Sequence, residues 1–261
     1  MLAGDRVYRQ LGVRFDRKPL ADVIAAALCE TSAPSFYVTC NLNHLRILQS
    51  DNEFREAYRK ATFITLDSRP IQIASRVCFG ERLPLVTGAE LFSVLFERLR
   101  PGKDRPFFVS SSDDTGRRLY QRLVERGFEH ESVVYYTPPF GFEHDTDRND
   151  AMIGHMQAHN TTHLFMGVGA PKSERWVAHN LGDLPPAHIF CVGAALDFTA
   201  GLKNRAPNWL RQLGFEWLHR LLSEPGRLMP RYAGDATILA KVLARHKLTK
   251  VSNATDTNNV T

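Results

Sequence analysis

Short apolar runs alternate with longer amphipathic stretches through residues 35–195. Six runs rich in β-branched and aromatic residues predict strands, within residues 35–41, 61–68, 105–112, 131–141, 162–169 and 188–195. Apolar residues at helical spacing predict helices between or after them, within residues 44–61, 70–79, 87–100, 114–125, 145–159 and 173–182. Strands that alternate with helices of this length form βαβ units. We therefore expect an α/β fold with an open, doubly wound, mostly parallel sheet of the Rossmann-like type.

Particular residue types mark several ends of these elements. Asp51 is a candidate N-cap inside the first helical stretch. Pro70 is expected to open the next helix, and Gly80 is expected to close it. Gly127 is expected to stop the helix that begins near Asp114.

The strand pattern stops after residue 200. Residues 201–250 keep apolar positions at helical spacing, with breaks at Pro225 and Pro230, and predict a helical appendage. The polar residues 251–261 predict a disordered tail. We therefore expect an α/β domain over residues 1–200, followed by the appendage and the tail.

Composition narrows the class of protein. The chain has 261 residues, of which 43% are hydrophobic, so it can bury a sizeable core. Its four cysteines include no Cys-x-x-Cys pair, which disfavours a disulfide framework or a structural zinc site and fits a reducing cytoplasm. The N-terminal residues carry charges every few positions, unlike a signal peptide, and no apolar window approaches the roughly 18 residues of a spanning helix. We expect a protein that is soluble or at most peripheral to a membrane.

Positive charge is concentrated near the C-terminal end. The formal net charge is +5, but residues 201–250 hold ten basic and three acidic residues. Such a segment favours an anionic partner: a nucleic acid, a phosphorylated ligand or an anionic membrane. A solvated helical face is the alternative.

The residues that follow each predicted strand are candidates for a binding site. The carboxyl ends of parallel strands share one edge of the sheet, and ligands bind there where the strand order reverses. These positions hold glycines, small polar side chains and a few charged groups: Thr39, Asn41, Asn43, Asp67, Arg69, Ser110, Ser111, Ser112, Gly167, Gly169, Lys172, Gly193 and Asp197.

The segment GVGAPK, residues 167–172, resembles a phosphate-binding turn. Its glycines allow close approach of the backbone to a ligand, and the helix N-terminus beyond them favours an anion. It is neither the dinucleotide fingerprint nor a P-loop. The alternative is a tight strand-to-helix connection with Pro171 at the first helical position.

Asp67 is the carboxylate best placed for general base chemistry, because it follows an apolar strand. Alternatively, it is the N-cap of the helix that opens at Pro70. Asp145 and Asp147 resemble an Asp-x-Asp metal motif but lie at a predicted helix start, where carboxylates commonly act as caps.

Three histidines spaced four apart do not make a convincing metal site. His155 and His159 lie in a predicted helix, but His163 falls in a predicted strand, and no carboxylate or cysteine completes the set. The chain also lacks a Gly-x-Ser-x-Gly elbow, so a serine hydrolase has no support.

Together, several of these segments resemble the WecG/TagA/CpsF family of bacterial glycosyltransferases (glycosyltransferase family 26). The similarity covers residues 35–232 and is most specific in GVGAPKSERW and in the stretch from GAALDF through RAPNW to EWLHRLLSEPGR. Thr39-Cys40-Asn41 is similar to the family's Thr-x-Asn, Asp67 falls where the family has Pro-Asp-Gly, and VTGAEL is similar to Val-Thr-Gly-x-Asp-Leu.

The resemblance implies an inverting, metal-independent transfer of a sugar at the cytoplasmic face of the membrane, with no cofactor. The implied donor is a UDP-sugar, the acceptor is a polyprenyl-diphosphate-linked saccharide, and Asp67 is the implied base. The appendage is expected to complete the site and to contact the anionic membrane through Arg220, Arg227 and Arg231. The expected substrate-binding residues are Thr39, Asn41, Thr87, Gly88, Gly167, Gly169, Lys172, Ser173, Glu174, Gly193, Asp197 and Arg205.

The sequence departs from the family at positions that bear on the substrate. Ser173 replaces a glutamine implied to contact the sugar, and Leu85 replaces an arginine, although Arg82 is nearby. Ser68 replaces the glycine of Pro-Asp-Gly, and serines replace a glycine pair after the third strand. We therefore predict UDP-glucose as donor, in exopolysaccharide or other cell-surface polysaccharide assembly, with UDP-N-acetylmannosamine or its uronate as the alternative.

Parts of the sequence are compatible with two functions other than a transferase. A non-catalytic nucleotide-binding regulatory module could keep the fold while losing turnover. A nucleic-acid binder could use the basic C-terminal segment, but no DNA- or RNA-binding motif supports it, so we expect no nucleic-acid partner. The pattern leaves open whether the chain forms a homo-oligomer.

Overall fold

The structure, a computed structural model, describes residues 11–204 and 206–207 and seven isolated positions further along. Those positions are 210, 222, 226, 229, 234, 237 and 240. The predictions made for Arg205, Arg220, Arg227 and Arg231 lie outside the described residues, as do those for residues 251–261 and for most of the appendage.

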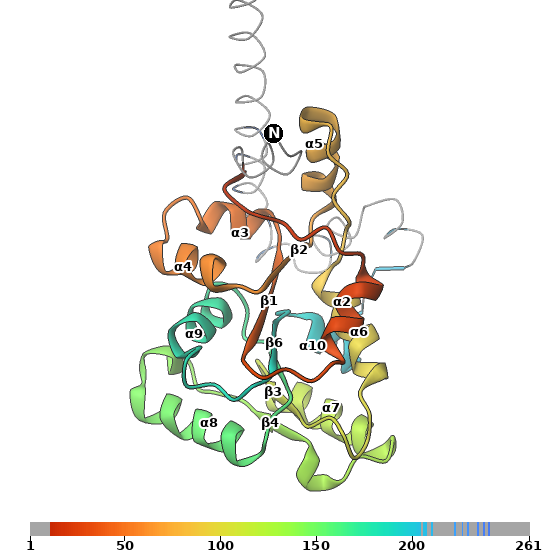
Figure 1. Ribbon diagram of the computed structural model, residues 1–261, viewed down its shortest axis with the longest axis vertical. Helices are drawn as coiled ribbons and strands as arrows, with labels where there is room; N and C mark the ends of the chain where they lie inside the picture. The colour runs from red at the N-terminus through yellow and green to blue at the C-terminus, as the bar shows by residue number, and fades with distance from the viewer. Residues whose placement is uncertain are drawn as a thin grey trace, which may run out of the picture.

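Six parallel strands form one sheet in the described part of the chain (Figure 1). They are β1 (Ser35–Cys40), β2 (Phe63–Leu66), β3 (Pro106–Val109), β4 (Val134–Tyr136), β5 (His163–Met166) and β6 (His188–Cys191). Their order across the sheet is β2-β1-β6-β5-β3-β4. The α/β fold class and the six predicted strands are confirmed, and β1 lies within the predicted residues 35–41.

Every predicted helical stretch within residues 44–182 contains a helix. They are α3 (Leu42–Ile47), α4 (Asn52–Lys60), α5 (Arg69–Phe79), α6 (Gly88–Arg98), α7 (Asp113–Glu125), α8 (Thr146–Ala158) and α9 (Lys172–Asn180). Helices that were not predicted are α2 (Leu20–Ala27), α10 (Ala195–Thr199) and the 3-10 turns η1 (His130–Ser132) and η2 (Phe142–His144).

The predicted end signals act mostly as expected. Asp51 caps α4 by accepting a hydrogen bond from the Phe54 amide at 2.9 Å, and Asp145 caps α8 in the same way. Gly80 ends α5 with a φ of +72°, a conformation that favours glycine. Pro171 precedes α9 as its N-cap, so the alternative that places it at the first helical position was wrong by one residue.

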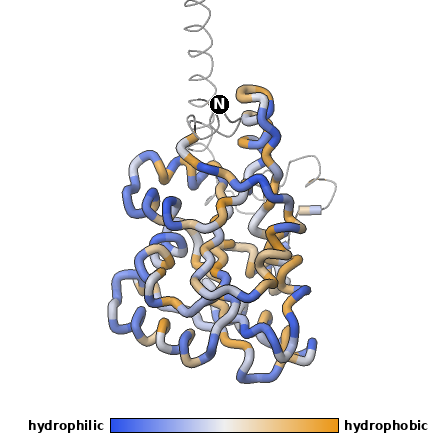
Figure 2. The backbone as a smooth tube through the Cα atoms, viewed as in Figure 1, coloured by the Kyte–Doolittle hydropathy of each residue, from blue (hydrophilic) through white to orange (hydrophobic). Residues whose placement is uncertain are grey.

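The helices cover the sheet on both faces. In Figure 1, α3, α4, α8 and α9 lie on one side of the sheet, and α2, α6, α7 and α10 lie on the other. Successive strand residues feed the two sides in turn: Phe36 and Val38 belong to the first core, and Tyr37 belongs to the second. Because both faces are buried, the strands read as continuous apolar runs (Figure 2).

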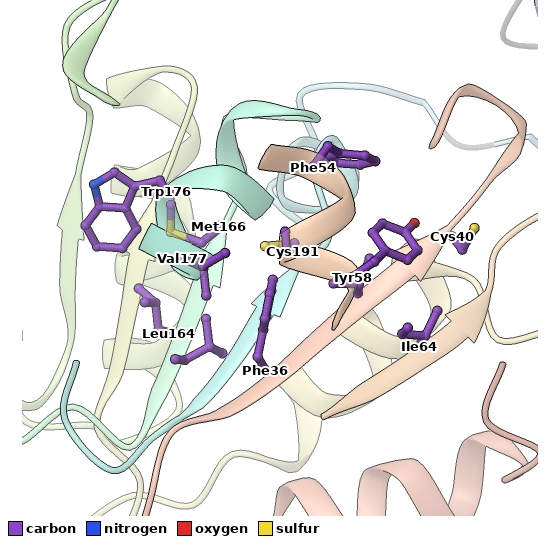
Figure 3. Packing of buried hydrophobic residues seen from close by; sticks show 14 of the residues in the cluster. Phe36, Cys40, Phe54, Tyr58, Ile64, Leu164, Met166, Trp176, Val177 and Cys191 are labelled. Atoms are coloured by element: carbon purple, nitrogen blue, oxygen red, sulfur yellow. The ribbon is translucent and has the colours of Figure 1, made fainter. Parts of the chain in front are cut away.

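Each core has its own packing. The first joins α4 and α9 to the sheet, and Figure 3 shows Trp176, Val177, Phe54 and Tyr58 close to the strand residues. The second is a ladder of rings across four neighbouring strands: Tyr37 stacks on Phe190, Phe190 on Phe165 and Phe165 on Phe108, with centroids 4.5, 5.2 and 5.4 Å apart. Rings at these spacings add to the stabilisation that comes from their burial.

Buried histidines tie α2 to the amino end of the sheet, opposite the candidate site. His163 donates from Nε2 to the carbonyl of Ala27 at 3.0 Å, and His188 donates to that of Cys29 at 2.8 Å. Burial lowers the pKa of His163 to about 4, so this side chain is neutral at physiological pH. Of the three evenly spaced histidines, His159 and His163 are buried and His155 is exposed. No group of three or more metal-ligating side chains occurs among the described residues.

Candidate active site

The carboxyl ends of the strands form one edge of the sheet, which we call the rim. The strand order reverses between β1 and β6. β1 and β6 are neighbours, but the chain leaves β1 toward α3 on one face and leaves β6 toward α10 on the other. The segments that follow these two strands turn to opposite faces of the sheet, and parallel sheets bind their ligands at such a point. The loops after β2 and β5 flank this point.

Asp67, Thr39 and Gly88 meet at this rim. The Asp67 Oδ2 atom accepts a hydrogen bond from the Gly88 amide at 3.1 Å, at the first residue of α6. A Cβ atom on Gly88 would lie 3.0 Å from Thr39 Oγ1 and 3.5 Å from Asp67 Oδ2. Glycine at position 88 therefore allows three elements to approach one another closely, and the N-terminus of α6 favours the negative charge of the carboxylate.

The alternative interpretation of Asp67 as a helix cap was wrong. Ser68 is the N-cap of α5 and accepts a hydrogen bond from the Ile71 amide at 3.4 Å. Thr87 has the equivalent role in α6, where its hydroxyl accepts from the Glu90 amide at 3.1 Å. The Asp67 side chain instead joins the end of β2 to the first residue of α6, and it is half-buried at the rim.

Three glycines line the loops after β5 and β6. A Cβ on Gly167 would lie 2.7 Å from Leu196 Cδ2, so no larger residue fits there without displacement. Gly169 and Gly193 have φ angles of +84° and +52°, and a Cβ on Gly193 would lie 3.9 Å from the Gly169 Cα. The two loops therefore pass close together with backbone alone between them, which is the arrangement that the phosphate-turn interpretation requires.

The side chains at the start of α9 point in different directions. Lys172 Nζ lies 4.0 Å from Glu143 Oε1 and 4.2 Å from the centre of the Phe140 ring, toward the connection between β4 and α8. Ser173 and Glu174 are only 1% and 2% exposed. The Ser173 hydroxyl and the Glu174 Oε2 atom have no hydrogen-bond partner among the described residues.

A buried polar chain connects α9 to α3 and α4. The Oε1 atom of Glu174 lies 3.9 Å from His44 Nε2, and His44 Nδ1 lies 2.8 Å from the Tyr58 hydroxyl. Burial raises the pKa of Glu174 to about 7, since its charged form has lost its water. Burial, together with the nearby carboxylates of Asp67 and Glu174, raises the pKa of Cys40 to about 12.

Sequence reasoning missed His44 and Tyr58. The available signal was weak: His44 is a polar residue among apolar positions of an amphipathic stretch, which is typical of a buried, hydrogen-bonded side chain. Neither residue could be paired with Glu174 from spacing alone, because more than 110 positions separate them from it.

Other predicted rim residues have structural partners. Asn41 caps α3 by accepting from the His44 amide at 3.2 Å. Asp197 accepts from the Thr115 hydroxyl at 2.9 Å and lies 3.2 Å from Lys203 Nζ, which ties α10 to α7.

The serines after β3 also stabilise local structure. Ser112 caps α7, and the Ser110 hydroxyl donates to the Ser112 carbonyl at 2.9 Å. Leu85, in the position of the family's arginine, bridges Leu66 at the edge of the sheet and packs against the first core. Arg82 lies exposed in the connection between α5 and α6.

The fold is an open parallel α/β sheet, a class of fold in which ligands bind at the carboxyl ends of the strands. A protein-family model described as "Glycosyl transferase WecG/TagA/CpsF family" matches residues 8–253 of the chain. The chain therefore belongs to this family, and it is a glycosyltransferase.

Two relatives from Staphylococcus aureus are named N-acetylglucosaminyldiphosphoundecaprenol N-acetyl-beta-D-mannosaminyltransferase. The protein of strain MRSA252 is 22% identical over 222 residues, which cover 84% of this chain and 85% of the relative. That of strain MW2 is 21% identical over the same shares. Among the described residues, no helix is long and apolar enough to cross a bilayer.

The contact at Gly88 gives the first prediction. In Gly88→Ala, the new methyl group meets Thr39 Oγ1 at 3.0 Å and Asp67 Oδ2 at 3.5 Å. The Thr39 side chain or α6 then has to give by a few tenths of an ångström, which disturbs the hydrogen bond from the Gly88 amide to Asp67. We expect turnover to fall at least about tenfold, which corresponds to roughly 1.4 kcal/mol of lost transition-state stabilisation.

Gly154→Ala is the matched control, because Gly154 lies in α8 with open space around its Cα. This variant should keep wild-type turnover and gain roughly 0.5–1 kcal/mol of stability. Steady-state kinetics and urea unfolding of both variants check the prediction. Wild-type turnover in Gly88→Ala would show that the close contact is not needed.

Proposed function

We propose that this enzyme transfers a hexose from a UDP-sugar to a polyprenyl-diphosphate-linked saccharide, with inversion and without a metal ion. The carboxylate of Asp67, fixed at the N-terminus of α6 beside Thr39, carries this proposal. The names of the relatives support the acceptor class, because both act on a sugar linked to undecaprenyl diphosphate.

The proposed reaction needs one base and stabilisation for one leaving group. The acceptor hydroxyl attacks the anomeric carbon of the donor while its proton passes to Asp67. The bond between the anomeric carbon and the diphosphate oxygen breaks, and UDP leaves with its additional negative charge. Backbone amides of the glycine loops near Gly169 and Gly193 are suited to this charge, as are Arg205, Arg220, Arg227 and Arg231.

The donor sugar is the finer part of the proposal. Ser173 stands where a glutamine is implied to contact the sugar, and its side chain is 1% exposed, so it offers little surface to a donor. A donor without an N-acetyl group makes fewer demands at this position, which favours UDP-glucose. The names of the relatives favour UDP-N-acetylmannosamine instead, which makes it the second candidate.

We also propose that the enzyme works at the inner face of the cytoplasmic membrane, without crossing it. The acceptor class is embedded in that membrane through its polyprenyl chain, and the basic residues 201–250 suit anionic headgroups.

Asp67→Asn tests the base. The amide keeps the size of the side chain and an oxygen for the Gly88 amide but cannot take a proton at neutral pH. We expect turnover to fall by roughly 10²–10⁴ while the donor KM changes little.

Asp22→Asn is the control, since Asp22 is an exposed carboxylate in the first turn of α2. Wild-type turnover in Asp67→Asn would exclude Asp67 as the base. Donor binding by the wild-type protein with no transfer to any lipid-linked acceptor would favour the non-catalytic nucleotide-binding module.

A comparison of donors tests the sugar. UDP-glucose, UDP-N-acetylmannosamine and UDP-N-acetylmannosaminuronate are each assayed with a synthetic polyprenyl-diphosphate-linked N-acetylglucosamine. We expect the highest kcat/KM and the largest rise in Tm with UDP-glucose, because a ligand stabilises in proportion to RT ln(1 + [L]/Kd). A higher kcat/KM for UDP-N-acetylmannosamine would overturn the preference and leave the proposed reaction class intact.

A further inference from the structure

Helix α5 presents apolar side chains to solvent. Ile73 and Val77 are 56% and 74% exposed and, four residues apart, lie on one side of the helix. The opposite side is buried through Ile71, Ala74 and Phe79. Single exposed aliphatic residues are ordinary, but two on successive turns of a projecting helix form a continuous apolar strip.

The projection formed by α5 and the returning residues 80–86 is braced. The Gln72 side chain donates to the Leu83 carbonyl at 2.8 Å, and the Ser75 hydroxyl donates to the Glu81 carbonyl at 3.0 Å. Arg17 also makes an ion pair with the buried carboxylate of Glu81. Figure 1 shows α5 extending away from the sheet, beyond the end where α3 begins. The apolar strip therefore stands on a rigid support.

The charge on this projection is positive. Arg76 and Arg82 are exposed, and neither has an ion pair among the described residues. Glu81 is the one acidic residue within 69–82, and it is 4% exposed and already paired. An exposed surface of aliphatic and basic side chains is complementary to an anionic bilayer, whose interface accepts the former and whose phosphates attract the latter.

The projection lies close to Asp67, the proposed base. Helix α5 begins two residues after Asp67 and has 11 residues, so it is about 16 Å long at 1.5 Å per residue. A membrane contact on this helix would hold the carboxylate at a fixed, short height above the bilayer. An acceptor sugar joined to its lipid by a diphosphate lies in this region.

We propose that the outer side of α5 docks on an anionic lipid bilayer, with Ile73 and Val77 in the interface and Arg76 and Arg82 at the phosphates. This inference rests on the proposed function where it takes the acceptor to be membrane-linked. A second copy of the chain fits the surface less well. Two aliphatic side chains fall far short of the roughly 800 Å² that each partner buries in a stable complex, and a two-fold contact would bring like charges together.

Vesicle binding of the full chain, without any sugar substrate, tests the docking surface. The vesicles contain phosphatidylcholine alone or with 30% phosphatidylglycerol, and binding is measured by co-sedimentation. The double variant Ile73→Ser with Val77→Ser should bind the anionic vesicles at least tenfold more weakly. Arg76→Gln with Arg82→Gln should weaken binding roughly twenty-fivefold at low salt, at about fivefold for each charge.

The control is Arg117→Gln with Arg118→Gln on α7, which removes the same net charge from exposed positions elsewhere. Both α5 variants keep the C-terminal segment unchanged, so their difference from wild type reports on α5. Unchanged thermal unfolding shows that the variants fold.

Three results would overturn the docking surface: equal binding of the wild type and the serine variant, equal losses in the α7 control and the Arg76/Arg82 variant, or a dimer in sedimentation that the serine variant abolishes. Because no sugar is present, failure of the proposed transfer would leave these results unaffected.

Discussion

The close approach of Asp67, Thr39 and Gly88 is the constraint on which the rest of the site depends. The Gly88 amide holds the carboxylate at 3.1 Å, and the absence of a side chain on Gly88 lets α6 begin against the ends of β1 and β2. A helix that begins there directs its N-terminus toward the carboxylate and favours its charge. Asp67 also lies two residues before the start of α5. The position of this carboxylate therefore sets both the proposed chemistry and its distance from the proposed membrane contact.

Many of the polar side chains at the rim cap helices or join one helix to another. Asn41 and Ser112 cap helices, and Asp197 joins α10 to α7, so their side chains already have partners within the fold. The side chain of Glu174 is withdrawn into a buried chain with His44. Asp67, half-buried and held by the Gly88 amide, is the rim carboxylate that we propose as the base.

Local sequence patterns predicted the strands, the helices and several helix ends, but they could not predict contacts between elements that are distant in the sequence. Apolar runs gave the six strands, and Asp51 and Gly80 marked helix ends, because these signals act within a few residues. The order β2-β1-β6-β5-β3-β4 and the pairing of Asp67 with Gly88 depend on how separate βαβ units pack. The cap of α5 was assigned to Asp67 as the alternative, although Ser68 fills it, because adjacent polar residues give the same signal.

The anomeric configuration of the product tests the central claim most directly. With Asp67 as the base, the proposed reaction is one displacement at the anomeric carbon, which inverts its configuration, whereas a double displacement through a glycosyl-enzyme intermediate retains it. Nuclear magnetic resonance of the purified glycolipid, through the one-bond carbon–hydrogen coupling at the new linkage, distinguishes the two outcomes. Transfer from an α-linked UDP-sugar should give a β-linkage. An α-linkage would contradict the account, because Asp67 acting alone as a base could not produce it.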